Sequence, residues 1–561
     1  MEDNFSVLIG GKAGDGINQA SLLIARLLNQ LGYRLYTYTD YPSLIRGGHN
    51  FSIIRAASDK IAVHLDKIDC LLALNQDCLD FHKHRFKDNT FIIYDSDTVK
   101  NLSGVSTQII GLPLGKIIKE ENAPAITRNS CLIGGLAQAV GLPWNILEGV
   151  FRKNISKETE LNLKLASRGY EGARELLKIK SFEQPPMPLL TGNEALSLGL
   201  IKAGLKTYIA YPMTPASSIL HFLAQAADDF GLKVIHPESE IGVILMALGF
   251  SYAGEKTAVG TSGGGFCLMT EGLSFAGMAE LPVVLVVSQR PGPSTGLPTY
   301  TAQGDLHFVL NAGQGDFTRL VVAPGDAEES YFWSALALNL AWKYQIPSLI
   351  LMDKTLSEGT YSFDLTSVPE VKEETPVLWD RKQPYQRYSD TPDGVSPLAF
   401  VPDKEAVIKI NSYEHDESGI TAEDPQKTKQ MNDKRLRKGV FLAEELETYP
   451  AVGVYGNKES KQALVCWGSN KGVCVEVGVR LGLKVIQPVV LNPFPAAQFK
   501  SALKGIEQVI CVENNATGQL ARLLNTYNFR VDEKILKYDG RAFGLEELEE
   551  SVHKKILMKA K

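Results

Sequence analysis

Residues 207–218 read TYIAYPMTPASS, and this stretch decides the class of fold. The apolar residues 207–210 are typical of a buried strand, and two prolines restrict the loop that follows. Thr214, Ser217 and Ser218 place hydroxyl groups at the carboxyl end of that strand. Ligands bind at this end in open α/β sheets, so the stretch predicts a ligand site on an α/β fold. A proline turn before a serine-capped helix explains only part of the string.

The same alternation of strand and helix extends on both sides of this stretch. Apolar runs at residues 233–235, 283–287 and 348–352 have the length and composition of buried strands, and segments with helical spacing separate them. We therefore expect residues 190–365 to form one α/β domain.

Two further segments show a similar pattern. Residues 1–180 open with an apolar run, a glycine loop at residues 10–16 and a helix, and a proline-rich linker ends the segment. Residues 456–561 again alternate strands and helices. Residues 366–455 are polar, carry blocks of opposite charge and show little apolar periodicity, which predicts a connector that is ordered only in places. The predicted fold is thus three α/β domains joined by linkers.

Composition narrows the classes of function. The chain has 561 residues, of which 44% are hydrophobic and 22% charged, and its formal charge of −6 gives no electrostatic reason to expect nucleic acid or an anionic membrane as the partner. The seven cysteines are scattered without a C-x-x-C pair, so neither disulfides nor a zinc or iron-sulfur site is expected. The acidic start and the short apolar runs predict a cytoplasmic protein without a membrane span.

Two loops of the first segment leave their role open. Residues 10–16, GGKAGDG, lie between a strand and a helix, where backbone amides bind an anion or simply make a tight turn. The sequence there matches neither a P-loop nor a complete dinucleotide-binding fingerprint. Residues 41–49, YPSLIRGGH, suit an interface as well as a ligand.

Residues 236–240, HPESE, place two carboxyl groups between a strand and an apolar helix. Glu240 lies at the start of that helix, where neighbouring side chains bury it in part. A buried carboxyl group has a raised pKa and can share a proton with a ring nitrogen. Helix capping is the ordinary explanation for one such residue and accounts for Glu238.

Two more strand ends carry candidate binding groups. Residues 260–266, GTSGGGF, predict an amide-rich turn that allows the backbone to approach a flat ligand. Arg290 begins the string RPGPSTGLPT, residues 290–299, directly after an apolar strand. A guanidinium group there suits bidentate binding of a carboxylate, although a surface arginine is the alternative.

In their order and spacing these strings resemble the alpha subunit of 2-oxoacid:ferredoxin oxidoreductases in the arrangement with a gamma-type domain fused to the N-terminus, and the 2-oxoglutarate enzymes most. The resemblance covers nearly the whole chain. It implies a gamma-type domain at residues 1–180, a thiamine diphosphate pyrimidine-type domain at 190–365, a connector at 366–455 and a transketolase C-terminal-like domain at 456–561. EHDESG at residues 414–419, Lys434-Arg435 and ENNATGQL at residues 513–520 carry the resemblance in the last two parts.

The resemblance implies thiamine diphosphate as cofactor, coenzyme A as co-substrate and ferredoxin as electron acceptor. It also implies a beta subunit that holds the diphosphate, Mg²⁺ and a [4Fe-4S] cluster, in an (αβ)₂ heterotetramer. Gly14-Asp15-Gly16 is similar to the start of the family's motif for Mg²⁺ and diphosphate, but the Asn-Asn pair that completes this motif does not follow before Asn50. The lone chain is therefore expected to hold no metal and to be inactive.

By the same resemblance Glu240 is the catalytic residue, because it hydrogen-bonds the aminopyrimidine ring of the cofactor. The expected substrate-binding residues are Thr214, Arg290 and Thr299. The expected cofactor-binding residues are Tyr211, Pro212, Glu240 and Gly263.

Some alternatives stay open. Met213 and Ala216 stand where the family more often has Ile and Ser, which affects the preferred substrate rather than the type of reaction. Pyruvate or branched-chain 2-oxoacids are the alternative substrates, and both directions of the reaction are compatible with the sequence. A different class of function is a non-catalytic subunit that binds a nucleotide or serves as a scaffold.

Overall fold

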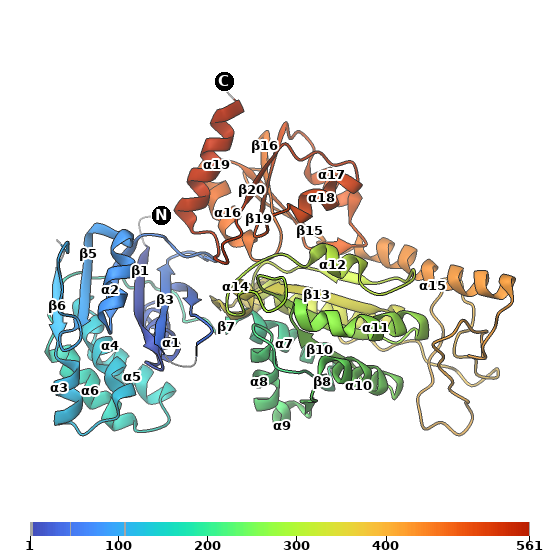
Figure 1. Ribbon diagram of the computed structural model, residues 1–561, viewed down its shortest axis with the longest axis horizontal. Coiled ribbons are helices and arrows are strands. Elements are labelled where there is room, and N and C mark those ends of the chain that lie inside the picture. Colours follow the sequence, from blue (N-terminus) through green and yellow to red (C-terminus); the bar gives the residue numbers. More distant parts are fainter. Residues whose placement is uncertain (1–3, 45–46, 106–107, 560–561) are drawn as a thin grey trace. The chain divides into compact units, whose positions relative to one another are not determined.

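The computed structural model describes residues 4–44, 47–105 and 108–559 (Figure 1). The chain forms two compact units. The first unit consists of Met1–Leu190, Gly359–Asp364 and Gly544–Glu550, and the second of Thr191–Glu358, Leu365–Phe543 and Ser551–Lys561. None of the described helices is both long and apolar enough to span a membrane.

The first unit is built on an eight-stranded mixed sheet with the order β6-β5-β4-β1-β3-β2-β14-β7. Its strands are β1 (Phe5–Ala13), β2 (Arg34–Asp40), β3 (Gly47–Ala57), β4 (Ile68–Ala73), β5 (Phe86–Asp95), β6 (Ile109–Leu112), β7 (Leu189–Thr191) and β14 (Thr360–Ser362). Its helices are α1 (Ile17–Gln30), α2 (Gln76–His82), α3 (Leu114–Glu120), α4 (Arg128–Ala139), α5 (Trp144–Asn154) and α6 (Thr159–Glu171), with 3₁₀ turns η1 (Lys83–Arg85) and η2 (Ala125–Thr127).

The glycine loop of this unit is a strand end followed by a turn. β1 runs through Gly10 and Gly11, and the chain turns at Gly14 and Gly16, whose φ angles of 92° and 72° favour glycine. The Asp15 carboxylate accepts the backbone N–H of Lys12 at 2.9 Å, which closes the turn. In the stretch 41–49, Ile45 and Arg46 lie outside the described residues.

The second unit contains two sheets. The larger has seven strands in the order β18-β12-β13-β11-β10-β8-β9, and the smaller has five in the order β15-β17-β16-β19-β20. The larger sheet comprises β8 (Thr207–Ile209), β9 (Lys233–Ile235), β10 (Thr257–Thr261), β11 (Val283–Gln289), β12 (Leu320–Val322), β13 (Pro347–Asp353) and β18 (Val490–Asn492). The smaller comprises β15 (Val452–Gly456), β16 (Gln462–Val465), β17 (Lys484–Pro488), β19 (Gln508–Glu513) and β20 (Glu533–Leu536).

The helices of this unit start with α7 (Gly192–Lys202), whose N-terminus carries the capping box that Thr191 and Glu194 predict. The others are α8 (Ser217–Gln225), α9 (Ala227–Phe230), α10 (Glu240–Tyr252), α11 (Gly263–Ala279), α12 (Leu306–Asn311), α13 (Ala327–Tyr344), α14 (Lys354–Glu358), η3 (Leu365–Ser367), α15 (Pro425–Leu446), α16 (Asn470–Leu481), α17 (Ala496–Ala502) and α18 (Gln519–Thr526). The last helix of the chain is α19 (Leu545–Lys559).

The three sheets confirm the predicted α/β class. Within the larger sheet, β8, β10, β11 and β13 pair in parallel, so their carboxyl ends meet at one edge. A single cluster of buried apolar side chains is shared by the two sheets of the second unit. β15 already pairs with β17 in the smaller sheet, although the sequence assigned it to the connector.

The connector is more ordered than its sequence predicts, because α15 is a continuous helix of 22 residues. The residues it buries include Met431 and Leu442 but also three cations, Lys434, Arg435 and Lys438. A polar face on the core side removes the apolar periodicity by which such a helix is recognised. The sequence therefore predicts order only in places within the connector, but it does not predict this helix.

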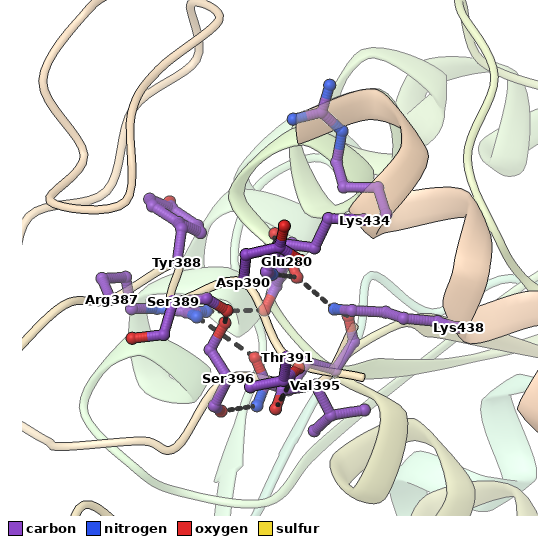
Figure 2. A network of polar contacts seen from close by, with 12 residues as sticks. Glu280, Arg387, Tyr388, Ser389, Asp390, Thr391, Val395, Ser396, Lys434 and Lys438 are labelled. Carbon is purple, nitrogen blue, oxygen red and sulfur yellow. Dashed lines mark hydrogen bonds and ion pairs between the residues drawn. The ribbon is translucent and has the colours of Figure 1, made fainter. Parts of the chain in front are cut away.

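The two buried lysines of α15 pair with one carboxylate (Figure 2), whereas Arg435 pairs with Glu414. Lys434 Nζ lies 2.9 Å from each oxygen of Glu280, and Lys438 also pairs with this carboxylate. Arg387 donates to the backbone oxygen of Glu280 at 2.7 Å. Burial acts to raise the pKa of Glu280, but the neighbouring cations, Lys434 foremost, hold it well below its ordinary value. Burial lowers the pKa of Lys438 to about 7.

Replacing Glu280 should destabilise the second unit strongly. Glu280→Gln leaves Lys434 and Lys438 buried without a counter-charge, which costs about 3 to 5 kcal/mol. Lys438→Met should cost far less, because Lys434 still pairs with Glu280. Urea denaturation of the two variants measures the difference, and equal losses would contradict this account.

A comparison of the wild type with Lys438→Met also tests a pH dependence of stability. The pKa of Lys438 is lower in the folded chain than in the unfolded chain, so unfolding takes up a proton between pH 7 and about 10. The stability contributed by this site should therefore rise with pH across that window in the wild type, and Lys438→Met should remove the rise.

Candidate active site

The predicted site residues gather where the parallel strands of the larger sheet end. Tyr211, Pro212 and Thr214 lie in the loop after β8, Gly263 follows β10, and Arg290 follows β11. The register pairs Val259 of β10 with Ile209 of β8 and with Leu285 of β11, so the three loops leave the same edge of the sheet. Glu240 joins them from the loop after β9, which is the neighbour of β8.

Glu240 is the first residue of α10, and its side chain is buried, with 5% of the residue exposed. The helix is capped by Ser239, whose hydroxyl accepts the N–H of Gly242, whereas Glu238 is exposed. The capping role expected for Glu238 therefore belongs to Ser239. One carboxylate oxygen of Glu240, Oε1, is buried and has no hydrogen-bond partner among the described residues. Such an atom calls for a ligand that shares a proton with it.

Two glycines allow side chains, including this carboxylate, to pack closely against the start of α11. A Cβ at Gly265 would lie 2.6 Å from Glu240 Oε1 and 2.2 Å from Thr261 Oγ1, and a Cβ at Gly263 would lie 2.6 Å from Asp305 Oδ2. The glycines form the first turn of α11, not the flexible turn that the sequence predicts. Glycine is required here because side chains approach the helix closely.

Arg290 and Thr214 are in direct contact. The Nη1 atom of Arg290 donates to the backbone oxygen of Thr214 at 2.9 Å. Burial lowers the pKa of Arg290, while the charge of Asp305 acts to raise it. A guanidinium group has five donors, so one bond to Thr214 leaves donors for a carboxylate. Thr299 is buried in the same loop, at the end of the string that Arg290 begins.

The remaining predicted residues lie in the loop after β8. Tyr211 is exposed, and its ring packs edge to face against His236 with 5.9 Å between centroids. Pro212 follows it in the exposed part of the loop. Met213, at one of the two positions that depart from the family pattern, accepts a hydrogen bond from Ser262 Oγ at 3.1 Å through its sulfur atom. The loop after β8 is thereby tied to the start of α11.

Asp305 is a further residue of the site that was not predicted from the sequence. Burial raises its pKa to about 6, although the charge of Arg290 opposes the shift. Its Oδ2 atom is buried without a hydrogen-bond partner among the described residues. One signal was available, because Asp305 is the only acidic residue between Arg290 and Asn311.

An apolar surface adjoins the site. α10 and α11 expose Ile241, Leu245, Met246 and Leu268, although most helices show polar residues to solvent. A groove of 940 Å³ runs along this surface and is lined by residues of both helices and of the segment 308–315. A contiguous apolar surface of this kind marks a protein interface or a ligand groove.

Comparison with known proteins identifies the family. Residues 198–434 match the family described as "Pyruvate flavodoxin/ferredoxin oxidoreductase, thiamine diP-bdg", and residues 6–172 match "Pyruvate ferredoxin/flavodoxin oxidoreductase". The alpha subunit of a 2-oxoacid:ferredoxin oxidoreductase from a Sulfolobus species is 31% identical over 98% of this chain and 97% of its own length. The chain belongs to this family of oxidoreductase alpha subunits, which confirms the resemblance.

Two further relatives narrow the comparison. The 2-oxoglutarate oxidoreductase subunit KorA of Mycobacterium tuberculosis is 27% identical over 97% of this chain and 90% of its own length. The solved structure of 2-oxoglutarate:ferredoxin oxidoreductase from Magnetococcus marinus, with 2-oxoglutarate, coenzyme A and succinyl-CoA bound, has a TM-score of 0.90 and 28% identity. It covers 99% of this chain and 100% of that one, so the two chains share one fold throughout.

Adjacent glycines of α11 provide a matched test of the site. Gly265→Ala should lower activity by about a hundredfold, the order expected when a catalytic group is displaced by about 1 Å, because the added methyl group collides with Glu240. Gly264→Ala should be tolerated, since its Cβ would meet nothing closer than 3.9 Å. The measurement is the steady-state rate of both variants. Equal activities would show that activity does not depend on the position of the Glu240 side chain.

Proposed function

We propose that this chain is the alpha subunit of a thiamine diphosphate-dependent enzyme that converts 2-oxoglutarate and coenzyme A to succinyl-CoA and CO₂, with electrons passing to ferredoxin, or runs the reverse reaction. The observation that carries the proposal is the unpartnered buried oxygen of Glu240 beside the glycine start of α11, at the same sheet edge as Arg290. The names of the KorA relatives and the ligands of the Magnetococcus marinus enzyme support 2-oxoglutarate. Pyruvate and branched-chain 2-oxoacids are the alternatives.

The residues present fit the cofactor. A buried acceptor without a partner among the described residues suits the ring nitrogen of an aminopyrimidine. The glycines at 263 and 265 allow the Asp305 and Glu240 carboxylates to lie against the first turn of α11. Glu240, Gly263, Tyr211 and Pro212 would hold this part of the molecule. When bound, thiamine diphosphate supplies the nucleophilic carbon and the electron sink that decarboxylation of a 2-oxoacid requires. The part of Glu240 is to hold a proton at the ring nitrogen.

The substrate would be held by Arg290, whose free donors form a bidentate pair with the 1-carboxylate. Thr214 and Thr299 would hydrogen-bond the carboxylate or the keto oxygen. The bond from Arg290 to the Thr214 carbonyl restrains one end of the guanidinium group before the substrate arrives, which lowers the entropy cost of binding. Coenzyme A would take the acyl group.

The partner would be a beta subunit that covers the apolar surface of α10 and α11 and carries the diphosphate and Mg²⁺ sites and a [4Fe-4S] cluster. Glu240 and Gly263 begin these two helices, so a chain seated on the surface borders the cofactor site directly. Among the described residues, no three His, Cys, Asp or Glu side chains lie close enough together to hold a metal ion. We propose an (αβ)₂ assembly for the complete enzyme.

The co-expressed pair of subunits tests this function. The complex should release thiamine diphosphate on denaturation and should reduce a viologen dye only with coenzyme A and a 2-oxoacid present. In a panel of acids, 2-oxoglutarate should have the highest kcat/KM. A complex without thiamine diphosphate would favour a scaffold or nucleotide-binding role.

The two glutamates after β9 should behave differently. Glu240→Gln should lower turnover by roughly 100- to 10,000-fold, the contribution expected of a group that holds a catalytic proton. Glu238→Gln changes an exposed carboxylate near the site and should leave the rate nearly unchanged. The ratio of the two kcat values is the measurement, and the reverse ranking would refute the assignment.

Arg290 should affect every 2-oxoacid alike. Loss of a buried charge-assisted contact costs about 2 to 5 kcal/mol, so Arg290→Ala should raise KM for 2-oxoglutarate and for pyruvate by similar factors. Arg290→Lys should restore only part of the affinity, because it lacks the planar fork. An effect confined to 2-oxoglutarate would instead assign Arg290 to the distal carboxylate.

A further inference from the structure

We propose that Asp305 is a positioning residue of the substrate site, which acts through Arg290, and that the Glu513–Gln519 loop of the smaller sheet holds Asp305 in place. The inference rests on the proposed function, because it assigns Arg290 to the substrate. The roles that the family motifs predict do not involve Asp305. The contacts proposed for the cofactor and the substrate do not involve the Glu513–Gln519 loop.

The Asp305 carboxylate lies in the site rather than in a structural ion pair. Both its oxygens are within 2.7 Å of the position that a Cβ of Gly263 would take, so the carboxylate lies against the first turn of α11. Oδ2 is buried and has no hydrogen-bond partner among the described residues. Although Asp305 precedes α12, its side chain does not cap that helix.

Arg290 is the charged group that acts on this carboxylate. Asp305 is held next to Arg290 in the chain's contacts, because its N–H donates to the side chain of Gln289, the residue before Arg290. Burial lowers the pKa of Arg290 and raises that of Asp305, and the charge of each residue opposes the shift of the other. Within the described parts of the chain the guanidinium group has one hydrogen bond, to the Thr214 carbonyl, and a long side chain held at one atom still rotates about that bond. The charge of Asp305 supplies a second direction and so orients the remaining donors.

Hydrogen bonds from two directions fix the backbone at Asp305. From the larger sheet, Gln289 Oε1 at the end of β11 accepts the N–H of Asp305 at 3.0 Å. From the smaller sheet, Gln519 Nε2 donates to the Gly304 oxygen at 2.6 Å, and its Oε1 accepts the N–H of His307 at 3.1 Å. One glutamine side chain thus spans the residues on both sides of Asp305.

Gln303 strengthens this attachment two residues earlier. Its N–H donates to the Asn514 oxygen at 2.7 Å, and its side-chain oxygen accepts the N–H of Asn514 at 3.0 Å. Its Nε2 donates to the Trp467 oxygen at 2.8 Å. The segment is therefore bound to the loops that follow both β16 and β19.

The Glu513–Gln519 loop is built to present Gln519. The buried carboxylate of Glu513 accepts the N–H groups of Leu520 and Ala521 at 2.8 and 3.1 Å, which satisfies the start of α18. Asn515 Oδ1 accepts the N–H of Gly518 at 2.7 Å. The string ENNATGQ, which the sequence analysis singled out, therefore acts on the site through Gln519 and Asn514.

The test uses the complete complex of both subunits. Asp305→Asn keeps the size and shape of the side chain and removes its charge. We expect KM for 2-oxoglutarate to rise roughly tenfold, with kcat within about twofold of the wild type. The calorimetric Kd for glutarate, a non-reacting dicarboxylate, should weaken by the same factor, while the content of thiamine diphosphate stays unchanged. Asp316→Asn, at an exposed position eleven residues further on, is the matched control.

Other results would overturn the proposal. An unchanged or lower KM would show that Asp305 does not orient Arg290. A fall in kcat at constant KM would place Asp305 at the reacting atoms, and loss of thiamine diphosphate would make it a cofactor contact. If the wild-type complex turns over no 2-oxoacid, the proposed function fails, and this outcome is distinct from a wild type that is active while Asp305→Asn has no effect.

A double-mutant cycle tests the part of the loop. Gln519→Ala should raise KM in the same direction as Asp305→Asn but by less, because the backbone bonds of Gln303 remain. In the double variant KM should not exceed that of Asp305→Asn alone. Factors that multiply would show that the Glu513–Gln519 loop acts independently of Asp305.

Discussion

The carboxylate of Glu280 is the constraint on which the second unit depends. Glu280 directly follows the last residue of α11 and has a left-handed backbone conformation, with φ of 51°. Its carboxylate pairs with two buried lysines of α15. Buried charges must be compensated, so the connector cannot detach from α11 without exposing or stranding them. The other end of the same helix forms the glycine wall of the site. The Glu280 network, which Figure 2 shows, therefore anchors one end of α11. The first turn at the other end of this helix borders Glu240.

The site itself is made by close approach at the edge of a parallel sheet. Glu240, Gly265 and Thr261 are packed so tightly that a methyl group has no room, yet one oxygen of Glu240 has no partner in the described part of the chain. A buried, unsatisfied acceptor lowers stability, so its presence needs an explanation, and the proposed contact with the cofactor provides one.

The smaller sheet contributes to the site without providing a side chain to the proposed ligand contacts. Its loops hold the segment from Gln303 to His307 by hydrogen bonds to backbone and side-chain atoms. The two sheets also share one apolar cluster, so their relative position is set by packing over a wide area. Such rigidity suits a site in which Arg290 must meet a carboxylate in one orientation.

The sequence alone determined the α/β class and placed Glu240 and Arg290 directly after strands, because apolar runs and turn residues follow local rules. Only the tertiary structure decided three other points. The first is the helix α15, whose polar face is buried because Lys434 pairs with Glu280, 154 residues away. The second is the residue that caps α10, which is Ser239 rather than Glu238. The third is the close approach of the Asp305 carboxylate to Gly263, 42 positions earlier in the chain. Local sequence patterns do not predict contacts between residues so far apart.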